Sequence, residues 1–256
     1  SPKARRSRPV DDAELVVEIQ QQVSELPSYG YRRVWGLLRR ARETQSLPAI
    51  NVKRVYRVMR DHNLLLERRI KQPGVPRRHE GRIAVKTSDT RWCSDGFEFR
   101  CEDGAKLSVT FALDCCDREA ISWSATTGGI NSVMVQDLLT ESVEKRFGNT
   151  LNLPHAVEWL TDNGSCYIAD ATRTFAVSLG FIVCTTPVRS PESNGMAESF
   201  VKTFKRDYVY VNDLPDAVTV MEKLTEWMED YNNWHPHKGL KMQSPREYRS
   251  SLLAIN

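Results

Sequence analysis

In the first quarter of the chain, apolar residues recur every three or four positions, which is the period of an amphipathic α-helix. This spacing predicts helices over residues 12–26, 31–43 and 52–62. A Ser-Tyr-Gly turn at 28–30 separates the first two helices, and Asn51 stands where it can cap the third. The pattern therefore predicts a small all-α domain.

After residue 87 the pattern changes to alternating or continuous apolar runs, which indicate β-strands. Three hairpin-like strands are expected first, over residues 92–99, 106–113 and 120–125. The rest of the chain alternates between helical spacing and short apolar runs, which predicts helices over 131–147, 169–179, 196–209 and 216–231 and strands over 156–160 and 181–184. This order is typical of an α/β layer fold with a mixed five-stranded sheet flanked by helices.

Charge divides the chain at the same place. Residues 1–86 contain 20 Lys and Arg against 9 Asp and Glu, a net charge of +11, whereas residues 87–256 contain 16 against 24, a net charge of −8. A basic segment beside an acidic body predicts a polyanion-binding module, and three short helices with a cationic third helix favour a helix-turn-helix that binds DNA. An ordinary bundle with solvated arginines is the alternative. The candidate DNA contacts here are Arg32, Arg33, Lys53, Arg54, Arg57 and Arg60.

These shifts give the expected domain boundaries. Residues 1–67 form the helix-turn-helix domain with a disordered basic start, and residues 68–86, with seven Lys or Arg, two Pro and two Gly, form a basic linker. Residues 87–210 form the α/β core, and residues 211–256 form a C-terminal helix and tail. The sequence contains no apolar run long enough for a transmembrane helix and no apolar region after the basic start that would indicate a secretory signal.

The six cysteines contain no C-x-x-C pair and have apolar neighbours. We expect them to be buried free thiols in a reducing compartment, and we do not expect a zinc site.

Three carboxylates on separate predicted segments carry the candidate chemistry. Asp95 lies in the first strand, Asp162 directly follows the fourth, and Glu198 lies in the first turn of a helix, with 35 residues between Asp162 and Glu198. Phosphodiester chemistry is often performed by two divalent metal ions, and Mg²⁺ prefers carboxylate oxygens. In this interpretation Asp95 bridges both ions, and Asp162 and Glu198 each hold one.

Each acid also has an ordinary structural explanation. Asp162 begins an Asp-Asn-Gly turn, and Glu198 could serve the helix dipole or form a salt bridge with Lys202. Asp95 has other acids nearby. The combination favours function, because Lys202 and Lys205 follow Glu198 by four and seven residues and share its helical face. These two lysines are further candidates for binding the DNA backbone.

Several motifs taken together resemble a known family. The N-terminal motifs are residues 29–34 and the helix at 51–62; the core motifs are Trp92 with Asp95, residues 161–164, and the run 190–198; the C-terminal motif extends from Tyr231 to Tyr248. They are similar to DDE-class transposases in the retroviral-integrase-like group of bacterial insertion sequences, the insertion sequence three family. The chain departs from many relatives at Asp95-Gly96-Phe97, where they have Asp-x-Thr, and at His235, where they have Arg.

The resemblance implies a ribonuclease-H-like integrase catalytic core joined to an N-terminal helix-turn-helix domain. It implies 3′-end cleavage and strand transfer of an insertion sequence, dependent on two Mg²⁺ ions for which Mn²⁺ can substitute. Asp95, Asp162 and Glu198 would be the catalytic metal ligands, and Lys205 matches the family's basic position.

The implied partners are double-stranded DNA, both element ends and target, a second copy of the chain on DNA, and an upstream-frame segment with a helix-turn-helix and leucine zipper. The implied location is the bacterial cytoplasm, in association with the nucleoid. Two alternatives stay open: a DNA-binding regulator of transposition that lacks activity on its own, and a ribonuclease-H-like nuclease.

Overall fold

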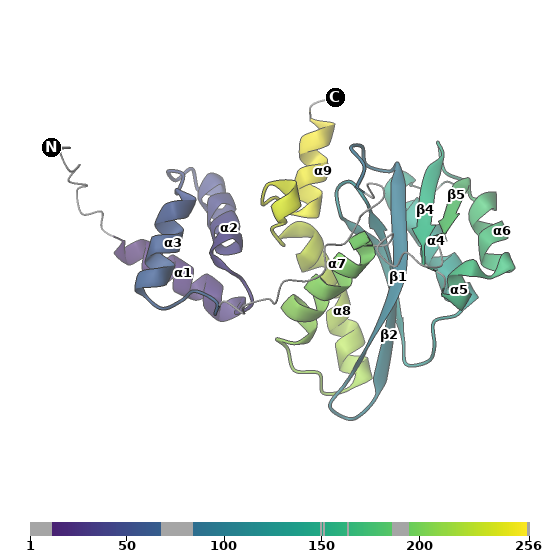
Figure 1. Ribbon diagram of the computed structural model, residues 1–256, viewed down its shortest axis with the longest axis horizontal. Helices are drawn as coiled ribbons and strands as arrows, with labels where there is room; N and C mark the ends of the chain where they lie inside the picture. Colours follow the sequence, from purple (N-terminus) through teal and green to yellow (C-terminus); the bar gives the residue numbers. More distant parts are fainter. Residues whose placement is uncertain are drawn as a thin grey trace, which may run out of the picture. The chain divides into compact units, whose positions relative to one another are not determined.

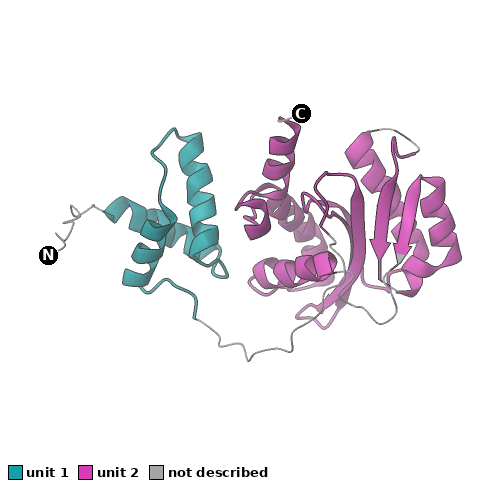
Figure 2. Cartoon of the chain, turned by 45° about the horizontal axis from the view of Figure 1, so that its top comes forward, with its two compact units in different colours: residues 1–72 teal, residues 73–256 magenta. Residues whose placement is uncertain are grey.

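The computed structural model describes residues 12–67, 84–148, 150, 152–162, 164–185 and 195–254. The chain divides into two compact units, Ser1–Gln72 and Pro73–Asn256 (Figure 2). The predicted disordered start and most of the predicted basic linker lie outside the described residues.

The N-terminal unit is a bundle of three helices, α1 (Ala13–Glu25), α2 (Tyr31–Thr44) and α3 (Val52–Asp61). All three were predicted, because their apolar positions fall on one face. Ile19, Val34, Val55 and Met59 are fully buried between the helices. The Asn51 side chain accepts a hydrogen bond from the Lys53 backbone N–H at 2.8 Å, which confirms the predicted cap.

The second unit is built on one five-stranded sheet in the order β3-β2-β1-β4-β5. Its strands are β1 (Arg91–Arg100), β2 (Lys106–Asp114), β3 (Ala120–Thr126), β4 (Val157–Thr161) and β5 (Phe181–Thr185). The first three strands pair antiparallel, whereas β4 pairs parallel with β1 and β5 pairs parallel with β4. Parallel pairs need crossover connections, which the intervening helices supply. The predicted mixed sheet is therefore confirmed.

Helices cover both faces of this sheet (Figure 1). One face packs against α4 (Ser132–Phe147) and α6 (Asp170–Ser178), with the short α5 (Ser165–Ile168) beside them. The other face packs against α7 (Gly195–Phe204) and α8 (Ala217–Asn233). Alternation along β1 supplies both layers, because Trp92 belongs to the first core and Phe97 to the second.

The C-terminal part differs most from the expectation. The predicted helix at 196–209 is α7 followed by a π-helical turn, η2 (Lys205–Val209). The helix predicted as the last one is not the last, because η3 (Lys238–Leu240) and α9 (Pro245–Leu253) follow it. A capping box formed by Ser244 and Glu247 begins α9, and this Ser-Pro-x-Glu signal was readable in the sequence.

The cysteine expectation is partly wrong. All six thiols are free, and four are buried, but Cys166 and Cys184 are partly exposed. Among the described residues no helix has the length and apolarity needed to cross a membrane.

Candidate active site

Asp95 lies in the middle of β1, the central strand of the sheet. Cys93 and Phe97, two residues to either side, belong to the core beneath α7 and α8, so alternation places Asp95 on the same face. One of its carboxylate oxygens accepts a hydrogen bond from the Gly96 backbone N–H at 2.7 Å. The sheet therefore fixes this acid on the face that α7 covers.

Asp162 directly follows β4, the parallel neighbour of β1. Ser94 and Thr161 are register partners in this pair, so Asp95 and Asp162 occupy the next position on each chain. The Asp162 Oδ1 accepts the Gly164 backbone N–H at 2.9 Å, which turns the chain away from the sheet. A Cβ at Gly164 would lie 3.0 Å from this oxygen, so the turn leaves little room for a side chain.

Glu198 lies in the first turn of α7, and its helix is held from two sides. The Phe200 ring lies 4.4 Å from the Phe111 ring of β2 and 4.9 Å from the Tyr231 ring of α8. Ala197 and Phe204 are also buried, so α7 lies against the face that carries Asp95. This packing brings Glu198 toward the sheet from a segment that is distant in sequence.

The electrostatics show that the three acids act on one another. The pKa of Asp95 is raised to about 6, mainly by burial and also by the charges of the Asp162 and Glu198 carboxylates, while the Gly96 N–H opposes this increase. Like charges disfavour the ionised form of a carboxyl group, whereas a nearby cation favours it. Among the described residues, neither Asp95 nor Asp162 has an ion-pair partner. Asp162 and Glu198 are thus near enough to Asp95 for their charges to act on it, and a divalent cation would relieve this repulsion.

The two lysines after Glu198 have different contacts. The Lys202 ammonium forms a salt bridge with Glu198 at 3.0 Å, so the ordinary i,i+4 pair is present. The Lys205 ammonium lies over the Phe97 ring, 5.7 Å from its centroid. Lys202 therefore contacts one of the three acids, whereas Lys205 lies beside a neighbour of Asp95 on the same face of β1.

Within the residues that the structure describes, no three His, Cys, Asp or Glu side chains converge closely enough to enclose a metal ion. Asp95, Asp162 and Glu198 instead make the local contacts given above, with Gly96, Gly164 and Lys202. Three carboxylates without an arginine still form a set of hard oxygen ligands, which is the chemistry that Mg²⁺ prefers.

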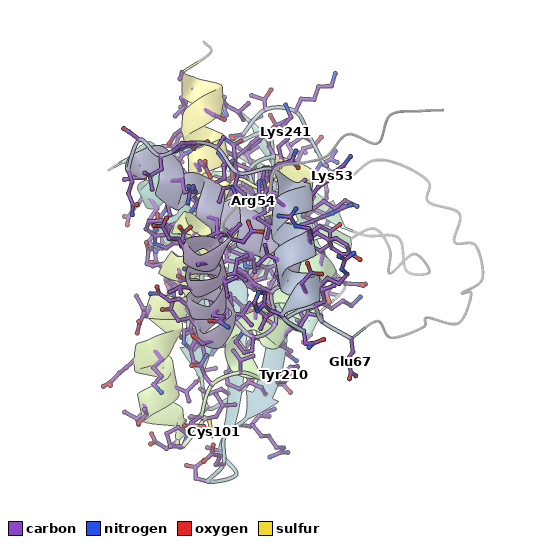
Figure 3. All side chains as sticks on the ribbon, turned by 90° about the vertical axis from the view of Figure 1, so that its left-hand side faces the viewer. Lys53, Arg54, Glu67, Cys101, Tyr210 and Lys241 are labelled. Carbon is purple, nitrogen blue, oxygen red and sulfur yellow. The ribbon has the colours of Figure 1, made fainter. Side chains whose placement is uncertain are left out.

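The candidate DNA contacts of the N-terminal unit fall into two groups. Arg54 and Arg57 both bind Asp12, at 2.7 and 2.6 Å, and so link α3 to the start of α1. Lys53, the neighbour of Arg54, lies on a different side of α3 (Figure 3) and is exposed. Of the remaining candidates, Arg32 contacts Tyr31, Arg33 lies over Tyr29, and Arg60 pairs with Asp61.

Sequence reasoning missed a buried ionic network in the second unit. Arg146 of α4 lies 3.1 Å from Asp117, 3.3 Å from Glu119 and 3.3 Å from Asp89. Arg246 of α9 binds the same Glu119 at 2.8 Å. From the sequence, Asp117 is expected to be a turn residue, because nothing near it indicates an arginine partner on a distant helix.

Comparison with known proteins agrees with this architecture. An HTH-like domain model matches residues 9–72, and two integrase core domain models match residues 86–191 and 183–245. In the solved simian T-cell lymphotropic virus intasome in complex with PP2A regulatory subunit B56 gamma, one chain aligns with a TM-score of 0.53 and 17% identity. That alignment covers 78% of this chain and 67% of the other, and at this identity it shows the fold alone.

Two Escherichia coli proteins are much more similar in sequence. Transposase InsD for insertion element IS2A/D/F/H/I/K is 59% identical over 245 residues, which cover 95% of this chain and 81% of that protein. Transposase InsD for insertion element IS2-9, from strain K12, is also 59% identical over 245 residues, and this alignment covers 95% of this chain and 79% of that protein. The predicted resemblance to retroviral-integrase-like transposases of bacterial insertion sequences is confirmed, and the chain belongs to the family of insertion-element DNA transposases that carry an HTH-like domain and a ribonuclease-H-like integrase core.

Proposed function

We propose that this transposase cleaves the 3′ ends of its insertion sequence and joins them to target DNA with Asp95, Asp162 and Glu198 as its catalytic carboxylates. The observation that carries the proposal is the position of Asp95, which lies beside Asp162 at the end of the neighbouring strand and on the sheet face that α7, the helix of Glu198, covers. Burial, together with the charges of Asp162 and Glu198, raises the pKa of Asp95 to about 6. Strained like charges of this kind cluster at functional sites. Neither the nuclease nor the silent regulator is favoured, since the most similar proteins reported above are named transposases.

The proposed cofactor is Mg²⁺, with Mn²⁺ as a substitute, bound as two ions. When bound, such ions align the attacking oxygen, from water in cleavage and from a 3′-OH in joining, and stabilise charge on the phosphate. Asp95 lies on the central strand, on the face that α7 covers, and this position supports the proposal that it would contact both ions. Asp162 directly follows the neighbouring strand β4 and Glu198 lies on the covering helix α7, and each would hold one ion.

Lys202 and Lys205 would neutralise DNA phosphates beside the acids. Lys202 is exposed and bound only through an i,i+4 pair, which is worth a few tenths of a kcal/mol, so a phosphate can replace Glu198 as its partner. That exchange would leave the Glu198 carboxylate available to a cation.

The proposed partners are the element ends and target DNA, a second copy of the chain on DNA, and an upstream-frame helix-turn-helix and leucine-zipper segment. A chromosomal DNA substrate places this activity at the bacterial nucleoid. The basic charge of residues 1–86 supports binding of the phosphate backbone by the N-terminal unit.

The test is strand joining in Mg²⁺, with precleaved element-end DNA and a plasmid target, and with the upstream-frame segment supplied separately. Asp162→Asn should lower the joining rate by about 10³-fold or more, because a metal ligand supplies several kcal/mol of transition-state stabilisation. Asp170→Asn, the same change at an exposed acid of α6, should leave the rate unchanged. Full activity of Asp162→Asn would overturn the site assignment, and cleaved products without joined strands would favour the nuclease.

A further inference from the structure

A surface hollow of about 350 Å³ lies where α2 and α3 begin. It is lined by Tyr31, Arg32, Val52, Lys53 and Tyr56. The two tyrosine rings meet edge to face with their centroids 5.0 Å apart, and the Arg32 Nε donates a hydrogen bond to the Tyr31 hydroxyl at 3.1 Å. The hollow therefore combines aromatic and aliphatic walls with two cationic side chains.

The cations on α3 differ in what they already bind. Arg54 and Arg57 hold the Asp12 carboxylate, and their hydrogen bonds and charges keep the pKa of Asp12 below its usual value although burial raises it. Lys53 is exposed, and its ammonium has no ion-pair partner among the described residues. Arg54 and Arg57 thus serve the bundle, whereas Lys53 is available to a ligand.

The hollow continues into the exposed face of α3. Lys53, Tyr56 and Arg60 follow one another at helical spacing and are exposed, while Val55 and Met59 on the opposite face are buried. Tyr56 is 37% exposed, so part of its ring is accessible from the surface beside Lys53. A narrow helix face with cations and one exposed ring is complementary in charge and width to the major groove of duplex DNA.

We propose that this face of α3 enters the major groove, that the hollow receives the 5-methyl group of a thymine, and that Lys53 and Arg32 bind the phosphates beside it. The thymine methyl group is the apolar feature of the major-groove base edges, and it fits a wall of Val52 and two tyrosine rings. A site that bound only a phosphate would need the cations but not the apolar side chains of the hollow. The proposal rests on the proposed function, since it identifies how the DNA substrate is recognised.

The first experiment compares two duplexes that carry the terminal sequence of the element, one natural and one with deoxyuridine at every thymine. The full chain should bind the deoxyuridine duplex at least about fourfold more weakly, the effect of one buried methyl group. Tyr56→Ala should bind both duplexes equally, and Tyr56→Phe, which keeps the ring, should still discriminate. Equal binding of both duplexes by the unaltered chain would overturn the methyl pocket, and preferential binding of single-stranded DNA would replace it with a base-stacking site.

The second experiment measures how affinity for the natural duplex depends on salt. Each phosphate contact contributes about 0.9 to the slope of log affinity against log salt concentration, so Lys53→Met and Arg32→Met should each lower the slope by about 1. Arg42→Met removes the same charge from α2, where Arg42 pairs with Glu18 at 2.8 Å, and should leave the slope unchanged while its melting temperature falls. An equal loss of slope in Arg42→Met would overturn the assignment of the phosphate contacts to Lys53 and Arg32.

The two proposals fail separately. Asp162→Asn should keep the full thymine discrimination while strand joining is lost. If Asp162→Asn still joins strands, the catalytic assignment is wrong and the pocket stands; if thymine discrimination is absent while joining depends on Asp162, the pocket is wrong and the catalytic assignment stands.

Discussion

The second unit contains two groups of acids that differ in their neighbours. Asp89, Asp117 and Glu119 surround the guanidinium of Arg146, a side chain that is only 1% exposed. In the active-site group, by contrast, Asp95 and Asp162 have no ion-pair partner among the described residues, and Glu198 has the exposed Lys202. Burial acts on both groups, but the charges that act on Asp95 are those of other carboxylates, whereas Asp117 lies against a buried guanidinium.

The difference teaches which acids are available for chemistry. Burial lowers the pKa of Arg146, but the carboxylates around it raise that pKa more, so its charge is permanent and fully compensated. Acids that already have a fixed guanidinium gain little from a metal ion. Asp95, whose pKa the other acids raise, would gain from any cation that enters. Mutual repulsion of carboxylates without an arginine therefore indicates acids that serve function, whereas acids that surround a buried arginine serve structure.

The largest expected effect comes from removing that arginine. Arg146→Met leaves buried carboxylates without compensation and should lower the free energy of unfolding by about 3–5 kcal/mol, measured by chemical denaturation. The free energy of unfolding of Arg146→Lys should lie between those of Arg146→Met and the unaltered chain, because lysine keeps the charge but lacks the planar guanidinium that reaches several acids. Asp95→Asn is the matched change in the other group. It should not lower stability, since the amide oxygen can still accept the Gly96 N–H. A small effect of Arg146→Met would remove the contrast between the groups.

The second largest effect is expected for Gly164→Ala, which tests how the backbone turn after β4 positions Asp162. A Cβ at Gly164 would lie 3.0 Å from the Asp162 Oδ1 and 3.1 Å from the Tyr167 ring. Tyr167 is buried and its hydroxyl is hydrogen-bonded to Thr110 at 2.8 Å, so the carboxylate must move instead. Gly164→Ala should therefore slow strand joining by about tenfold with little change in melting temperature.

Gly129→Ala is the control for this change, because a Cβ there meets nothing within 4 Å. It should leave the joining rate unchanged. Undiminished joining by Gly164→Ala would show that the placement of Asp162 tolerates displacement.

The contrast between the two groups also shows what the sequence could predict. The sheet and the main helices follow from periodicity, since burial on one face is a local property of each segment. Asp162, directly after a strand, and Glu198, in the first turn of a helix, were predicted from local motifs, whereas Asp95, in the middle of a strand, was predicted from its combination with the other two acids. These signals are local, and they need no knowledge of partners.

The arginine network was not predictable in this way. Arg146 appears in the sequence as a cation in the last turn of a helix, where it would serve the helix dipole, and Asp117 lies 29 residues earlier in a turn. Asp12 similarly looks like a simple helix cap, although it binds Arg54 and Arg57 from a helix 40 residues away. Pairing of distant ions depends on the tertiary fold, which periodicity does not specify.

A third effect concerns the pH dependence of stability. It arises at Asp114, a buried acid whose pKa responds to Asp117 and Arg146 of the structural group. Burial and, after it, the charge of the Asp117 carboxylate raise the pKa of Asp114 from 3.8 to about 7, although Arg146 opposes both. Between about pH 4 and 7 the folded protein keeps a proton that the unfolded chain releases, so stability falls as pH rises through this range. The slope should reach up to about 1.4 kcal/mol per pH unit.

Asp114→Asn should remove this slope, measured as the free energy of unfolding at several pH values, whereas Asp170→Asn should keep it. If both variants keep the same slope, Asp114 is ionised in the folded protein and the arginines compensate the group completely.

The smallest effect concerns Lys202, the cation of the active-site group. Its salt bridge with Glu198 joins side chains that are 75% and 39% exposed, so Lys202→Met should change the free energy of unfolding by only about 0.3–0.5 kcal/mol. Lys145→Met, which breaks the i,i+4 pair with Glu141 on α4, is the matched control. Mn²⁺ should raise the melting temperature of Lys202→Met more than that of the unaltered chain, because no ammonium competes for Glu198. A stability loss as large as that of Arg146→Met would instead make Lys202 a structural cation, and the two groups of acids would no longer differ in kind.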